Sequence, residues 1–136
     1  MNRYGRIWDV RYEEMNDDLF RRGYNFLPQS SCAELTNQCF AHLWRWLKAA
    51  KMQSRILMQV HDSLVCSCVY GEAYDVACFM RDHLEVELDY GGVGLSVPTE
   101  FKIGMNYGDV VEIGALQDRV TFEQKIWEVM RVGNKE

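Results

Sequence analysis

A short polar segment between two apolar runs holds the residues best suited to chemistry. The runs are "RILMQV" and "LVCSCV", and His61, Asp62 and Ser63 lie at their junction. Two such runs separated by a short polar turn predict a β-hairpin. A carboxylate at the tip of a hairpin is open to solvent and held in place by paired strands, so Asp62 is a candidate ligand for a hard cation such as Mg²⁺.

Two other interpretations of this turn compete with a metal site. Asp62 could simply hydrogen-bond the backbone of its own turn, as Asp commonly does, and composition alone favours this interpretation. A nucleophilic His-Asp-Ser set is rejected, because consecutive turn residues point in different directions and cannot form the relay of a triad. One carboxylate is also rarely sufficient, since two-metal phosphoryl chemistry needs at least two acidic ligands around ions about 4 Å apart.

Charge is distributed unevenly along the chain. The 136 residues are 48% apolar and 26% charged, with a formal net charge of −5, which is typical of a soluble globular domain. Residues 1–60 hold nine Lys or Arg against six Asp or Glu, whereas residues 61–136 hold six against fourteen. Any contact with a polyanion is therefore expected in the first half. No apolar run approaches the roughly 20 residues of a membrane span and no signal-peptide core is present, so we expect a cytosolic protein without a membrane partner.

Cysteines and glycines provide no second site. The five cysteines form no CxxC pair, and their apolar neighbours predict reduced, buried thiols rather than a metal-thiolate centre. Three glycines in "GGVG" are neither preceded by a strand nor followed by Lys-Ser/Thr, so they predict a flexible connector rather than a phosphate loop.

The periodic pattern predicts an α+β fold. The first 30 residues are expected to be irregular or only partly helical, and a capping box from Ser31 to Glu34 opens a helix that runs to about Lys51. After the hairpin, a second helix is expected from Ala73 to Leu88, then a strand in "LSVPTEFKIGM", then a helix beginning at Thr121. This order predicts a small antiparallel β-sheet packed against helices.

The hairpin segment resembles a known family. "ILMQVHDSLV" closely resembles motif C of the family A DNA polymerases, the DNA polymerase I type, usually written (L/M)-Q-V-H-D-E-(L/V). "RRGYNFLPQSSCAEL" and "LSVPTEFKIGMNYGD" are similar to family segments upstream and downstream of it, with Tyr107 where tryptophan is usual. "YGR" resembles the glycine-arginine that follows the fingers. These segments occur in the order of the family, over roughly residues 4–110.

The resemblance implies roles for the matching residues. Asp62 would bind the catalytic Mg²⁺ ions and His61 would lie beside the primer terminus, which makes these two the candidate catalytic residues. Amide side chains can sense the minor-groove acceptors that all correct base pairs share. The implied DNA-binding residues are Arg6, Arg21, Asn25, Gln29 and His61.

Departures from the family limit what this chain does alone. Ser63 stands where the family has glutamate, so only one carboxylate of a two-metal site is supplied. The D-Y-S-Q-I-E-like motif A with the other aspartate, the fingers helix and the thumb are absent from these residues. We therefore expect a palm fragment or subunit of a phage-like family A DNA-directed DNA polymerase that is inactive alone.

In that interpretation a partner chain carrying motif A and the fingers completes the enzyme. The assembled complex would bind primer–template DNA and deoxynucleoside triphosphates, in the cytoplasm of a bacterium or of a phage-infected host cell. Residues 1–116 would be a partial palm domain and residues 117–136 a C-terminal helical extension. The alternative is a non-catalytic structural or DNA/protein-binding module derived from a palm.

Overall fold

A long helix forms one side of the structure. The computed structural model describes residues 17–89 and 91–133, and its first element is α1 (Asp17–Ala49), a helix of 33 residues. Ser31 therefore lies inside this helix rather than at an N-cap, so the predicted capping box is wrong. Of the first 30 residues, expected to be irregular or only partly helical, residues 17–30 are helical. Pro28 is also inside the helix. A continuous helix was not predicted there because the segment contains Gly23 and Pro28, which disfavour a helix interior, and its apolar residues show no clear period.

The predicted hairpin is confirmed. Strand β1 (Arg55–Val60) pairs antiparallel with β2 (Ser63–Ser67), and the ladder has an irregularity between Ile56 and Met58. Glu72 fixes the start of β1 because its carboxylate accepts hydrogen bonds from the backbone N–H groups of Gln53 and Ser54, at 3.1 and 2.8 Å.

The second helix is shorter than predicted. Helix α2 (Ala73–Leu84) ends before Leu88, which instead belongs to strand β3 (Leu88–Asp89) and pairs with Leu95 of β4 (Gly94–Leu95). The glycine segment thus closes a small hairpin, and Gly91 and Gly92 have φ values of 68° and 92° that residues with a Cβ rarely adopt.

The third predicted strand begins later and has a partner that the pattern did not reveal. Strand β5 (Phe101–Asn106) starts after Pro98 and pairs antiparallel with β6 (Asp109–Gly114). The Asn106 side chain accepts the N–H groups of Gly108 and Asp109 at 3.0 and 2.9 Å, which closes the turn between them.

The last helix is present and begins slightly earlier than predicted. Helix α3 (Arg119–Gly133) begins two residues before Thr121. The Asp118 carboxylate accepts hydrogen bonds from the Thr121 N–H and Oγ1 at 3.1 and 2.7 Å, so Asp118 is the capping residue of this helix.

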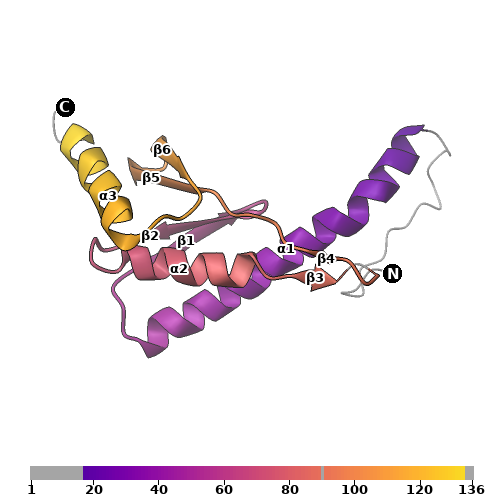
Figure 1. The fold of residues 1–136 in the computed structure, drawn as a ribbon, viewed down its shortest axis with the longest axis horizontal. Helices are drawn as coiled ribbons and strands as arrows, with labels where there is room; N and C mark the ends of the chain where they lie inside the picture. Colours follow the sequence, from indigo (N-terminus) through magenta and orange to yellow (C-terminus); the bar gives the residue numbers. More distant parts are fainter. Residues whose placement is uncertain (1–16, 90, 134–136) are drawn as a thin grey trace.

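These elements confirm an α+β fold, although the described strands form three separate two-stranded sheets rather than one. Helix α2 lies across α1, with the β1–β2 hairpin beside them and α3 next to β5 and β6 (Figure 1). Two buried clusters meet at α2. The first contains Leu43, Leu47 and Val76, and the second Ala77, Phe122 and Ile126.

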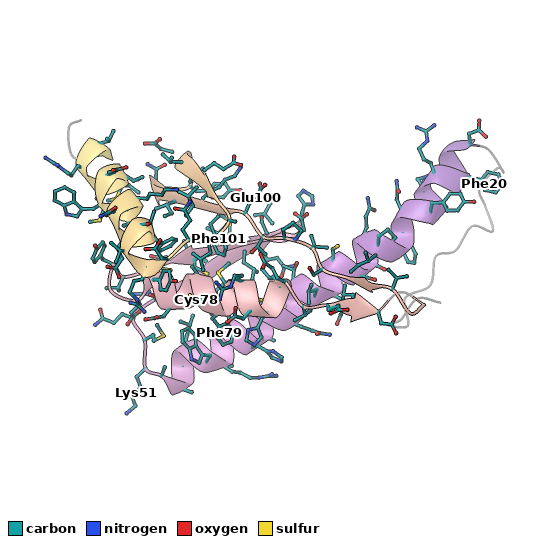
Figure 2. All side chains as sticks on the ribbon, viewed as in Figure 1. Phe20, Lys51, Cys78, Phe79, Glu100 and Phe101 are labelled. Atoms are coloured by element: carbon teal, nitrogen blue, oxygen red, sulfur yellow. The ribbon has the colours of Figure 1, made fainter. Side chains whose placement is uncertain are left out.

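The N-terminal half of α1 extends beyond the other elements (Figure 1). Figure 2 places Phe20 at its outer end and Lys51 just past its opposite end. Over the residues that the structure describes, no helix combines the length and the apolar character needed to cross a bilayer.

Candidate functional site

The turn between β1 and β2 is a two-residue loop. Val60 pairs with Ser63, so only His61 and Asp62 lie outside the ladder, and Ser63 Oγ donates a hydrogen bond to the Val60 carbonyl oxygen at 2.7 Å. His61 has a φ of 53°, in the left-handed region, at a position that glycine usually fills when such a loop has one positive φ. For a residue with a Cβ this backbone costs about 1–2 kcal/mol. Strain of this kind is common beside functional groups.

The Asp62 side chain is open to a ligand. It is exposed, and no group in residues 17–89 or 91–133 donates a hydrogen bond to its carboxylate. The polar contacts inside the turn come instead from the Ser63 hydroxyl and the Gln59 amide. An unpaired, solvent-facing carboxylate on a fixed turn is chemically suited to bind Mg²⁺ through oxygen.

The described part of the chain supplies one such ligand, not a full metal site. Within it, no three His, Cys, Asp or Glu side chains are grouped closely enough to hold an ion. A complete site at Asp62 would therefore need further oxygen ligands from outside these residues.

The candidate DNA-binding residues of α1 share one face of the helix. Arg21, Asn25 and Gln29 follow at four-residue steps, each turned by about 40° around the axis, and all three are exposed. Thr36 lies close to the same line, and its Oγ1 is 3.4 Å from the backbone oxygen of Asp62. With a rise of about 1.5 Å per residue, Gln29 lies roughly 10 Å and Arg21 roughly 22 Å along the axis from Thr36. The row thus starts beside the turn and continues along the projecting half of α1 (Figure 1).

Two residues that contact the turn were missed by sequence reasoning. Thr36 and Asn37 of α1 reach Asp62 and Gln59, respectively, which are 26 and 22 residues further along the chain. Single polar contacts at this separation leave no periodic signal. Arg6 lies outside the described residues, so its predicted role has no structural counterpart here.

The cysteines lie apart from this chemistry. All five are free, and burial raises the pKa of the Cys39 thiol to about 11. Burial, with smaller contributions from Cys68 and Cys39, raises the pKa of Cys66 to about 12. These two thiols are thus protonated near neutral pH and poor metal ligands. Cys39 is buried as predicted, whereas the other four are not fully buried: Cys32, Cys66 and Cys78 are half-buried and Cys68 is exposed.

Comparison with known proteins identifies the family. The family model described as DNA polymerase family A matches residues 1–109, and the chain belongs to this family. The chain is 29% identical over 97 residues to a DNA polymerase of Bacillus phage SP01, which covers 68% of this chain and 10% of that protein.

Bacterial relatives match at a similar level. Identity is 28% over 102 residues to DNA polymerase I of Mycobacterium leprae, covering 75% of this chain and 11% of the relative. The chain is 27% identical over 103 residues to the thermostable DNA polymerase I of Thermus thermophilus, a match that covers 76% of this chain and 12% of the relative. The chain thus spans about a tenth of the length of the curated relatives that it matches. No solved structure matches it significantly.

Proposed function

We propose that this chain is a palm portion of a family A DNA-directed DNA polymerase, with the β1–β2 hairpin as motif C. The observation that carries the proposal is the exposed Asp62 carboxylate on a fixed turn, next to the α1 face that bears Arg21, Asn25 and Gln29. Membership of the family supports it.

Each of these residues has a role in the proposal. Asp62 binds metal and His61 contacts the primer end, while Arg21 contacts the template–primer backbone. The side-chain amides of Asn25 and Gln29 donate hydrogen bonds at the minor groove, where acceptors are shared by all correct pairs. Arg6 is a further DNA contact in this scheme, outside the described residues.

The reaction is nucleotidyl transfer to a primer 3′-hydroxyl. Bound Mg²⁺ would supply stabilisation of the charge that develops on the reacting oxygens, and Asp62 is the residue of this chain that would hold it. Asp62 would hold a Mg²⁺ ion, and the row of Arg21, Asn25 and Gln29 on α1 would orient the duplex, so this chain would contribute positioning to the reaction.

A complementary chain with motif A and the fingers would complete the enzyme, which uses primer–template DNA and deoxynucleoside triphosphates. In this scheme the location is the cytoplasm of a bacterium or phage-infected cell. Residues 1–116 belong to the palm and 117–136 form an added helical extension. A non-catalytic, palm-derived binding module is the second candidate, and Ser63 favours it because the family has a carboxylate at that position.

Replacing Asp62 by asparagine tests the proposal. Asp62→Asn keeps the size of the side chain and removes its charge, so extension by the complex should fall by more than about 100-fold. Circular dichroism and the melting temperature should stay close to those of the unchanged protein, because the side chain is exposed. Primer extension with the reconstituted complex is the measurement.

Asp109→Asn is the matched control, since Asp109 is an exposed aspartate beside the turn of another hairpin. It should leave extension unchanged. Near-normal extension by Asp62→Asn would remove Asp62 from the mechanism, and robust extension by the 136-residue chain alone would overturn the need for a partner. A pull-down that recovers no polymerase-like chain would favour the binding module.

A further inference from the structure

Two neighbouring side chains of helix α1, Thr36 and Asn37, contact the hairpin at the turn that carries Asp62. The Asn37 Oδ1 accepts a hydrogen bond from Gln59 Nε2 at 3.0 Å, and the same Gln59 amide lies 3.4 Å from the carbonyl oxygen of His61. One residue earlier, Thr36 Oγ1 donates to the Cys32 carbonyl at 3.0 Å and lies 3.4 Å from the Asp62 carbonyl oxygen.

These contacts end on the two residues of the loop itself. The backbone carbonyls of His61 and Asp62 are outside the β1–β2 ladder, so the ladder alone does not fix how the loop tilts. Thr36 is almost fully buried, at 2% exposure, which places one anchor where water competes little. The Asn37–Gln59 pair is more exposed and forms the second anchor.

Two contacts from the same helix fix the orientation of the His61–Asp62 loop as well as its distance from the helix. Thr36 lies on the same face of α1 as Asn25 and Gln29, so these contacts fix the position of the loop relative to that row of side chains. A loop held only by its strands would keep its fold but tilt, and a tilt at a residue in the left-handed region changes where the next side chain points.

We propose that Asn37, assisted by Thr36, is a positioning residue that fixes the orientation of the Asp62 turn relative to α1. The inference rests on the proposed function for its effect on catalysis, but the contacts from Thr36 and Asn37 to the hairpin are a property of this chain. It predicts that losing the Asn37 acceptor loosens the turn without unfolding the hairpin.

Amide hydrogen exchange on the isolated chain is the first test. Asn37→Ala should speed exchange in residues 60–63 by about 2- to 10-fold, the range expected for one lost hydrogen bond. Asn37→Asp, which keeps an acceptor oxygen, should restore slow exchange. Gln38→Ala is the matched control, because Gln38 is an exposed amide on the same helix with no hydrogen bond to the described residues. Unchanged exchange in Asn37→Ala would overturn the proposal.

Extension by the reconstituted complex is the second test. Asn37→Ala should lower kcat by about tenfold, raise the Mg²⁺ concentration for half-maximal rate and leave the KM for nucleotide nearly unchanged. Thr36→Val should act in the same direction, and Thr36→Ser should behave as the unchanged protein. A merely structural role would instead lower the amount of folded protein and leave the Mg²⁺ dependence in place.

The two tests separate failure of the inference from failure of the proposed function. If Asp62→Asn abolishes extension but Asn37→Ala changes neither exchange nor the Mg²⁺ dependence, the positioning role is wrong and the function stands. If Asp62→Asn extends normally, the function is wrong, and the exchange result alone decides whether Asn37 holds the turn.

Discussion

Ser63 follows Asp62 in the proposed motif C, at the position where the resemblance predicts glutamate. Its hydroxyl donates to the Val60 carbonyl at 2.7 Å and so contributes to closing the turn, but it brings no charge beside Asp62. A single carboxylate binds Mg²⁺ less strongly than a pair, because affinity for hard cations rises with the number of charged oxygen ligands.

Ser63→Glu should therefore lower the Mg²⁺ concentration that the reconstituted complex needs for half-maximal extension. Loss of the hydroxyl should also reduce the free energy of unfolding by about 0.5–1.5 kcal/mol. A Mg²⁺ titration of extension and a urea melt measure the two effects. Ser63→Ala separates them, since it loses the same hydrogen bond and adds no charge. Equal Mg²⁺ dependence in both variants would place residue 63 outside the metal neighbourhood.

At this scale the sequence could predict which residues lie in the turn but not what holds them. His61 and Asp62 stand out because they interrupt two apolar runs. The left-handed backbone of His61 and the contacts from Thr36 and Asn37 depend on how α1 packs against the hairpin, which no local pattern encodes.

Three carboxylates fix the ends of elements, and each has a lowered pKa. Glu72, before α2, is stabilised in its charged form by the Ser54 hydroxyl and then by the N–H groups of Gln53 and Ser54. The pKa of Glu85 is lowered by the Thr99 hydroxyl and N–H, and that of Asp118 by the hydroxyl and N–H of Thr121. These hydrogen bonds connect the start of β1 to the start of α2, the segment before β5 to the end of α2, and Asp118 to the first turn of α3.

The lowered pKa values predict acid sensitivity. A carboxylate whose pKa is lower in the folded protein than its ordinary value stabilises the folded state at pH values above the ordinary one, which is about 4.5 for Glu72. This stabilisation is lost as the pH falls through the pKa of the folded state. The melting temperature should thus drop steadily below about pH 4.5. Glu72→Gln should be less stable at pH 7 and show a smaller further loss on acidification.

Glu100→Gln is the control for Glu72, because Glu100 is exposed and makes no hydrogen bond with the described residues. Its melting curve should follow that of the unchanged protein from pH 7 to pH 3. Should Glu72→Gln keep the full acid dependence, the ties at Ser54 and Gln53 do not contribute to it.

Elements with an apolar stripe were predictable, and those without one were not. The core positions Leu43 and Leu47 of α1 and the Phe122–Ile126 pair of α3 are buried as their spacing indicates. The exposed start of α1, the two-residue strands β3 and β4, and β6 lack such a stripe. In β6, four of six residues are exposed, so alternation gives no signal there.

At the scale of the whole molecule, α2 joins two parts that are otherwise separate. Val76 faces the cluster with α1 and the β1–β2 hairpin, whereas the adjacent Ala77 faces the cluster with α3, β5 and β6. An α+β class followed from the order of elements. The division into three small sheets depends on pairings between strands, which the order alone does not specify.

Because the β1–β2 hairpin that carries Asp62 packs against the first cluster through Ile56 and Cys66, the candidate site should survive damage to the second cluster. Phe122 is 5% exposed and anchors α3 on Ala77, so Phe122→Ala should cost about 3–5 kcal/mol in the stability of α3, β5 and β6. Amide exchange should rise strongly in residues 101–133 and little in residues 55–67. Val132→Ala, at a side chain 73% exposed on the same helix, should change stability by less than about 0.5 kcal/mol. Equal loss of protection in both segments would contradict this division, because the two clusters would then unfold as one unit and the Asp62 turn would depend on α3.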